Sequence, residues 1–146
     1  MKNISVSNKF TRHSNAVAAG TTVLTPASGI DMQGFETVVF LVSFGAITAS
    51  AVTSIEVHQS ADDSTYNALL GSNVVVADDD DNKVFYIEVN KPVDRYLKLI
   101  VNRATQNAVL DGIVAIQGGP RVAPVTHDST TIGGGEFNVS PAEGTA

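Results

Sequence analysis

The sequence predicts an all-β fold, a sandwich of two antiparallel sheets. Almost every apolar run is short, rich in Val, Ile, Phe or Thr, and closed by Gly, Asn, Asp or Pro. This is the pattern of strands and the turns between them. Several runs also alternate between apolar and polar residues, as strands with one solvated face do. We expect about seven or eight strands at the spacing of a two-sheet sandwich.

The first part of the predicted domain contains two strands. Residues 16–25 (AVAAGTTVLT) form a strand with a kink at Gly20, and the turn Pro26-Ala27-Ser28-Gly29 ends it. Residues 35–44 (FETVVFLVSF) are the longest apolar run. The continuity of this run predicts a strand that is buried on both faces, and its Val and Phe content favours strand over helix.

The rest of the domain alternates more clearly. In residues 52–59 (VTSIEVHQ), Ile55 and Val57 share one face, and the polar residues between them share the other. A polar loop over residues 60–66, a helical turn over 68–70 and a short strand over 74–76 follow. Further strands are predicted over residues 83–89 (KVFYIEV), 96–102 (YLKLIVN) and 109–117 (VLDGIVAIQ).

Three regions follow from this pattern: an N-terminal arm over residues 1–15, a β-sandwich domain over 16–121 and an extended C-terminal tail over 122–146. The tail is rich in Thr, Gly, Pro and Ser and cannot form a core of its own. We expect a neighbouring molecule to hold it. Three isolated apolar residues are the candidate anchors: Ile132, Phe137 and Val139. The alternative is an exposed tail with incidental apolar residues.

Charge is distributed unevenly along the chain, whose net charge is −6. Residues 1–30 carry Lys2, Lys9 and Arg12 without an acid, whereas residues 31–90 carry ten acids and one Lys. An acidic total argues against nonspecific binding to nucleic acid, which depends on clustered Lys and Arg. We expect the basic arm to meet an acidic protein surface. No apolar segment resembles a secretory signal or a membrane span, so we expect a soluble protein made in the cytoplasm.

The sequence contains little that indicates catalysis. The absence of cysteine excludes disulfides, thiolate zinc sites and cysteine nucleophiles. His13, His58 and His127 lack the spacing of zinc ligands, and no nucleophile elbow, phosphate loop or dinucleotide fingerprint is present. We therefore expect no enzyme activity, no catalytic residues, no metal and no cofactor.

Two sets of carboxylates leave alternatives open. Asp62-Asp63 and the run of four acids at residues 78–81 offer oxygen ligands for calcium, but solvated turns are the stronger interpretation because neighbouring carboxylates repel one another. Glu56 and Glu88 offer a pair for glycoside hydrolysis, yet alternation places both on solvent-facing positions. The chain has no Trp and three Tyr, few aromatic residues for stacking sugars.

Several turn and strand motifs resemble those of capsid decoration, or cement, proteins of tailed bacteriophages. They are Ser28–Phe35 (SGIDMQGF), Phe44–Ile47 (FGAI), His58–Asp63 (HQSADD), Asp94–Lys98 (DRYLK) and Gly118–Arg121 (GGPR). The resemblance spans about residues 16–124 and implies a jelly-roll-like sandwich. It also implies a homo-oligomer, a dimer or trimer, that sits on the outside of the capsid and clamps neighbouring major capsid protein subunits.

The predicted function is therefore that of a structural virion protein that stabilises a bacteriophage capsid. Its expected partners are the major capsid protein and further copies of itself, without nucleic acid or membrane. We expect partner contacts from Lys2, Lys9, Arg12, Ile132, Phe137 and Val139. A head-fibre base or a tail-associated β-sandwich is the main alternative, and a carbohydrate-binding module is a weaker one.

Overall fold

The computed structural model describes residues 3–140 and 142–145. Among these residues, no helix has the length and apolar content needed to cross a membrane. The elements are the helix α1 (Ile4–Ser7) and the strands β1 (Lys9–Ser14), β2 (Val17–Gly20), β3 (Ile30–Asp31), β4 (Thr37–Ile47), β5 (Val52–Ser60), β6 (Asn67–Ala68), β7 (Val74–Val76), β8 (Val84–Asn90), β9 (Tyr96–Ala104) and β10 (Ala108–Gly118).

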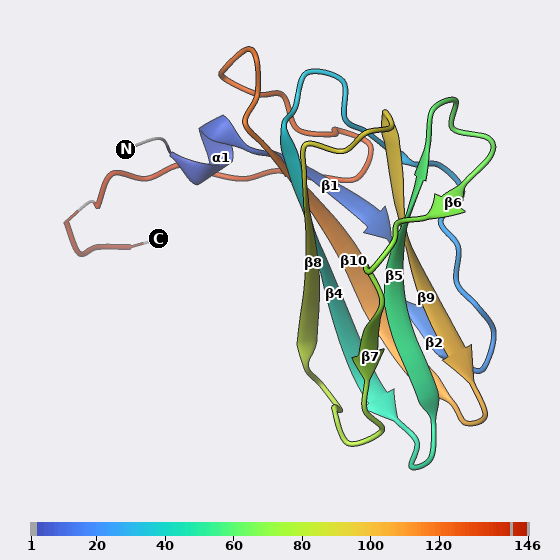
Figure 1. The fold of residues 1–146 in the computed structure, drawn as a ribbon. Coiled ribbons are helices and arrows are strands. Elements are labelled where there is room, and N and C mark those ends of the chain that lie inside the picture. Colours follow the sequence, from blue (N-terminus) through green and yellow to red (C-terminus); the bar gives the residue numbers. More distant parts are fainter. Residues whose placement is uncertain (1–2, 141, 146) are drawn as a thin grey trace.

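The strands form two antiparallel sheets that pack as a sandwich (Figure 1). In sheet A the order is β1-β10-β4-β8, and β2 pairs with β10 beyond the end of β1. In sheet B the order is β3-β9-β5-β6, and β7 also pairs with β5. The chain crosses between the sheets after β2, β3, β4, β7, β8 and β9, which gives the strand order of a jelly roll. The predicted all-β, jelly-roll-like sandwich is confirmed.

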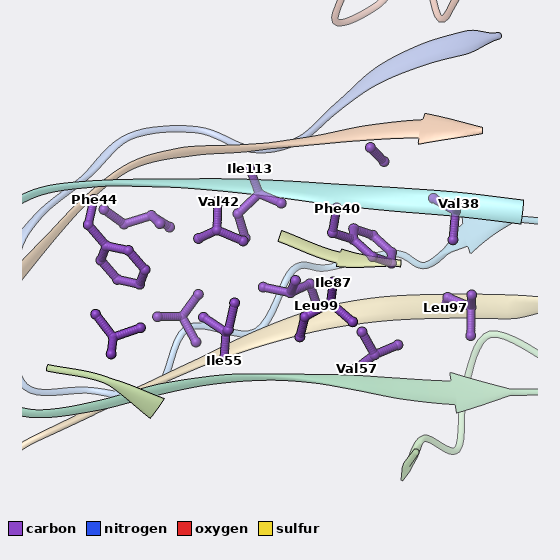
Figure 2. Packing of buried hydrophobic residues seen from close by; sticks show 14 of the residues in the cluster. Val38, Phe40, Val42, Phe44, Ile55, Val57, Ile87, Leu97, Leu99 and Ile113 are labelled. Carbon is purple, nitrogen blue, oxygen red and sulfur yellow. The ribbon is translucent and has the colours of Figure 1, made fainter. Parts of the chain in front are cut away.

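The core lies between the sheets and is made by alternate residues of the long strands. Every second residue of β4 from Val38 to Phe44 is at most 1% exposed. Figure 2 shows these side chains pointing away from β4 toward those of β5 and β9, including Ile55 and Leu99. Burying each such side chain stabilises the fold by about 1.5–3 kcal/mol, so this alternation fixes the register of the strands.

One end of the core is closed by a buried arginine. Arg103 is 3% exposed, and its Nη1 donates to the backbone carbonyls of Ala18 (2.9 Å) and Ala108 (2.7 Å). Its Nε donates to the carbonyl of Thr22 (3.0 Å). A guanidinium carries several donors in a fixed fork, so a single side chain satisfies carbonyls from β2, the following loop and β10.

Most of the predicted strands are present, but three expectations differ from the structure. The strand expected over residues 16–25 is limited to β2, because the chain then crosses toward sheet B, where Leu24 bridges Val101. The helical turn expected over residues 68–70 is replaced by the end of β6 and a turn in which Leu69 packs against the core and Leu70 is exposed. Residues 9–14, expected within an arm, form β1, because Phe10 and His13 find places on opposite faces of sheet A.

The prediction that β4 is buried on both faces is wrong. Val39 and Leu41 lie between the core residues of β4 and are only half-buried, on the outer face of sheet A. The continuous apolar run therefore does not indicate a central strand covered on both sides. It indicates a strand with one face in the core and a second apolar face at the surface.

Candidate functional site

The candidate site is the junction between the C-terminal tail and β1, an edge strand of sheet A. An edge strand presents unpaired backbone groups on one side. Here the N–H of Phe10 donates to Nδ1 of His127 (3.1 Å), and its carbonyl accepts from the N–H of Asp128 (3.3 Å). The N–H of Arg12 donates to Oγ1 of Thr131 (3.1 Å). The chain itself thus holds this part of the tail, and no neighbouring molecule is needed for it.

An apolar pocket lies between the tail, α1 and β1. The rings of Phe10 and His127 stack with their centroids 4.7 Å apart and their planes 10° apart. Together with Ile132 and Phe137 from the tail and Ser5 from α1, they line a pocket of about 460 Å³. Phe137 remains 53% exposed at its rim. Ser129 and Glu136 add polar groups to a lining that is mainly apolar, and such a pocket suits an apolar side chain from another molecule.

The structure brings together some of the predicted partner-binding residues and separates others. Ile132 and Phe137 line the same pocket, whereas Val139 is 79% exposed on the tail beyond it. Arg12 is exposed on β1. Lys2 lies outside the described residues.

Lys9 is half-buried on β1, and its charge acts on acids of the same chain. Hydrogen bonds from Thr130 are the main cause that lowers the pKa of Asp128, and the charge of Lys9 lowers it further. Lys9 also contributes to the lowered pKa of Asp31, for which the hydrogen bond from Arg95 is the main cause. Part of the basic charge expected to face a partner is therefore directed toward the protein's own carboxylates.

Three of the five motifs behind the bacteriophage resemblance, Ser28–Phe35, Asp94–Lys98 and Gly118–Arg121, meet at one end of the sandwich. The guanidinium of Arg95 forms a two-point ion pair with Asp31, with N–O distances of 2.8 and 2.6 Å. The N–H of Met32 donates to the carbonyl of Arg95 (2.8 Å), and the N–H of Arg121 donates to that of Gly34 (2.9 Å). Three separate turn motifs thus form one bonded assembly, and a shallow groove runs along it.

The acidic turns bind backbone groups. In the run at residues 78–81, Asp78 accepts from the N–H of Ser50 and Asp81 accepts from that of Ile47, both at 2.5 Å. Asp62 accepts from the N–H groups of Ser64 and Thr65, and hydrogen bonds led by Ser64 hold its pKa below the usual range. Within the described residues, no group of three or more His, Asp or Glu is placed to hold a metal ion.

A further set of contacts joins two loops on the outer side of sheet B. Asp63 accepts from the hydroxyl of Tyr66 and from the N–H of Gly29 (2.8 Å). Burial and the neighbouring Asp63 both raise the pKa of Tyr66. The ammonium of Lys98 lies 4.0 Å from the centre of the Tyr66 ring and donates to the carbonyl of Ala27 (2.9 Å). These contacts hold the chain between β2 and β3 against sheet B.

The three histidines occupy three different environments. His58 is half-buried on β5 and pairs with Glu56 at 2.9 Å. His127 lies on Phe10, as described above. His13 points into the sandwich, where its Nε2 accepts from the N–H of Leu99 (3.3 Å) and its ring lies 5.3 Å from that of Phe40. Burial, followed by the charge of Lys98, lowers the pKa of His13 to about 4.

The candidate glycosidase carboxylates do not meet. Glu56 is on β5 in sheet B and Glu88 is on β8 in sheet A, and both alternate with core residues that face the interior. Their carboxylates therefore lie on opposite outer faces of the sandwich, and the arrangement does not form a pair around a bound sugar.

Sequence reasoning missed the central feature of the site, the contact of His127 with Phe10. These residues are separated by 117 positions. No local pattern links them, because the tail has neither strand alternation nor helical periodicity. The weak alternation of residues 9–13 is the single available signal that Phe10 belongs to an edge strand.

No family model matches the chain, and no curated protein matches it. Among solved structures, the chain is similar to one of infectious bursal disease virus Gx strain, with a TM-score of 0.40 and 13% sequence identity. The similarity covers 82% of this chain and 32% of that chain. The chain thus spans about a third of the length of that structure's chain.

Proposed function

We propose that this chain is a structural virion protein that decorates a bacteriophage capsid and stabilises it by clamping neighbouring major capsid protein subunits. The jelly-roll sandwich and the turn motifs gathered around Asp31 and Arg95 agree with the resemblance in the sequence. On this proposal the protein is made in the host cytoplasm and lies on the outer surface of the virion. It uses no cofactor, and it contacts neither nucleic acid nor membrane.

The observation that carries the proposal is the terminal projection, formed by α1 and residues 132–140. Figure 1 shows both terminal segments leaving the sandwich together on the side of sheet A. The projection exposes Ile4, Phe137 and Val139, which are 71%, 53% and 79% exposed. Isolated apolar side chains on an extended segment are suited to insertion into pockets of a partner.

The anchoring of the tail lowers the cost of such binding. A free tail loses conformational freedom when it binds, and this ordering opposes association. Here the bonds of Phe10 and Arg12 to the tail already fix residues 127–131. Only the segment beyond Ile132 remains to be ordered by the capsid, so a few apolar anchors suffice.

Basic residues near the N-terminus supply the second half of the proposed contact. Arg12 is exposed on β1, and on this proposal it faces acidic capsid surface together with Lys9 and Lys2. Such contacts at a rim affect the rate and the salt dependence of association more than the final affinity. Attachment should therefore weaken as ionic strength rises.

The test is cosedimentation of the purified protein with undecorated capsids. We expect binding at a fixed ratio to the major capsid protein. The variant F137S/V139S should lose binding about tenfold or more, because it removes two exposed anchors without touching the core. Val93→Ser is the matched control, since Val93 is 89% exposed in a loop of the sandwich.

Two outcomes would contradict the proposal. If the wild-type protein does not bind capsids, the role moves to a fibre or tail structure. If F137S/V139S still saturates capsids with unchanged salt resistance, the terminal projection is not the attachment site. Circular dichroism of both variants shows whether the sandwich is intact, so a folding defect is not mistaken for lost attachment.

A further inference from the structure

The outer face of sheet A is unusually apolar for a solvated surface. The cross-strand rows are given by the register. One row is Arg12, Val114, Leu41 and Tyr86, and the next is Phe10, Ile116, Val39 and Glu88. Val84 lies in a third row beside Ser43. We call the apolar members other than Phe10, which His127 covers, the A face: Val39, Leu41, Val84, Tyr86, Val114 and Ile116.

The A face is open in the structure. Val84 is 60% exposed, Tyr86 68% and Val114 37%, while the more central side chains are half-buried by their neighbours. Its members lie on the three strands β10, β4 and β8, about 4.8 Å apart, and in three rows about 6.8 Å apart, which gives an area of about 300 Å². The largest apolar patch on a soluble monomer is commonly of about this size and is often functional.

The outer face of sheet B shows the contrast. There the positions of β5 that alternate with its core residues hold Ser54, Glu56 and His58, and Asn102 of β9 bonds to Ser54 at 3.4 Å. That face is more polar and carries internal hydrogen bonds, as expected for a sheet that faces water, although Val52 and Val75 are also exposed on it, at 61% and 73%. Among the described strands, no cross-strand row on the outer face of sheet B holds three apolar residues side by side, as the row of Val114, Leu41 and Tyr86 does in sheet A.

Charges at the two edges of the A face indicate what covers it. Arg12 lies on β1 at one edge, and its Nη2 lies 3.9 Å from the place a Cβ would occupy at Gly112. Glu88 lies on β8 at the other edge and accepts from the hydroxyl of Thr37 at 3.2 Å. Within residues 3–140 and 142–145, neither charge forms a salt bridge. A surface with a cation at one edge and an anion at the opposite edge is complementary to its own copy.

We propose that the A face binds the A face of a second copy of this chain, in a two-fold symmetric dimer. The two-fold axis runs parallel to the strands, midway between the two A faces and above the gap between β10 and β4. It places β1 of one copy opposite β8 of the other. It sets Val114 against Leu41 and Arg12 over the ring of Tyr86, a cation–π arrangement beside Glu88. Two sheets packed this way lie about 10 Å apart.

The position of the terminal projection fits this dimer. It leaves the sandwich on the side of sheet A, so a second copy on the A face lies next to it (Figure 1). The flat area of the A face is below that of a standard interface, which indicates a reversible dimer that dissociates on dilution. This inference rests on sheet A and does not need the capsid assignment, but the two proposals share Arg12. In the dimer the Arg12 guanidinium contacts the second copy, and the capsid contact then falls to Lys2, Lys9 and the terminal projection.

The test is sedimentation velocity of the full chain over a hundredfold range of concentration. We expect a monomer that converts to a dimer as concentration rises. Tyr86→Glu and Val114→Lys should each abolish the dimer. Both side chains are exposed, so these changes leave the core intact. Val75→Glu is the matched control, because Val75 is 73% exposed on β7 of sheet B and should leave the dimer unchanged.

A charge exchange tests the geometry. Arg12→Glu and Glu88→Arg should each weaken the dimer about tenfold, and the double variant should recover most of the affinity. A wild-type protein that stays monomeric overturns the inference, and so does a dimer unaffected by Tyr86→Glu or Val114→Lys. A trimer, or a double variant weaker than both single variants, overturns the two-fold arrangement.

Discussion

At the scale of single residues, His13 couples the stability of the sandwich to pH. The pKa of His13 falls from 6.5 in the unfolded chain to about 4 in the folded protein. Between pH 6.5 and about pH 4, His13 binds a proton in the unfolded state but not in the folded state. The free energy of unfolding therefore decreases as pH falls. The contribution is complete above pH 6.5 and amounts to about 3 kcal/mol.

Replacing His13 by Gln should flatten this dependence. A glutamine carbonyl still accepts the N–H of Leu99 but does not titrate, so unfolding midpoints in denaturant should vary less between about pH 6.5 and 4. The measurement is a series of urea unfolding curves followed by circular dichroism. His58→Gln removes a half-buried histidine that pairs with Glu56 on β5, outside the core, and should keep the part of the decline that His13 causes. A wild-type stability that is constant over this range would rule out a buried neutral His13.

Arg103 is a residue whose loss should be severe. Arg103→Met removes the donors to the carbonyls of Ala18, Thr22 and Ala108, of which Ala108 is a fully buried residue, and it also leaves a gap at a position that is 3% exposed. We expect destabilisation of at least about 3 kcal/mol. Arg103→Lys keeps the charge but not the forked set of donors, so it should destabilise the protein less than Arg103→Met does. Thermal unfolding of the three proteins measures the order, and equal stabilities would show that these bonds contribute little.

At the scale of elements, the acidic turns act as backbone caps. Asp81 holds the N–H of Ile47 at the end of β4, so Asp81→Ala should cost about 1–2 kcal/mol. Asp79→Ala is the control, because no hydrogen bond to the Asp79 side chain is present among the described residues. Added calcium should leave the melting temperature of the wild type unchanged, whereas a rise would restore the metal interpretation of this turn.

The elements themselves were largely predictable from local pattern. Alternation over residues 52–59 and 96–102 predicts strands with one buried face, and the structure places β5 and β9 there. In β9, however, Lys98 and Ile100 on the other face are buried as well. The continuous run of β4 was misread because sequence does not distinguish an apolar residue in the core from one on a second apolar surface. Val39 and Leu41 are such residues. Whether such a residue is buried depends on what packs on the sheet, and the local sequence pattern does not show this.

At the scale of the whole molecule, the tail completes a sheet that would otherwise end in a bare edge. A chain that stops after Pro124 loses the contacts of His127, Asp128 and Thr131 with β1. We expect it to keep the circular dichroism of the sandwich but to aggregate through the uncovered strand. Light scattering during storage measures this. A chain that stops after Gly133 keeps the cover and should remain soluble, and equal behaviour of the two would show that the cover is not protective.

The candidate site was less predictable than the fold. The apolar residues Ile132 and Phe137 could be singled out because they are isolated in a polar segment. Their common pocket could not, because its other wall is Phe10 at the opposite end of the chain. Contacts between distant segments depend on topology, and topology is settled only when all strands have found their neighbours.

The same topology sets the order of events during folding. β1 pairs with β10, about a hundred residues later in the chain, and β3 pairs with β9. Neither early strand can pair before its late partner has been synthesised, so apolar segments of the nascent chain stay unpaired until then. Contacts between residues so far apart in the sequence slow folding to milliseconds or seconds. Yield in the cell should therefore depend on chaperones and temperature more than the stability of the finished sandwich would suggest.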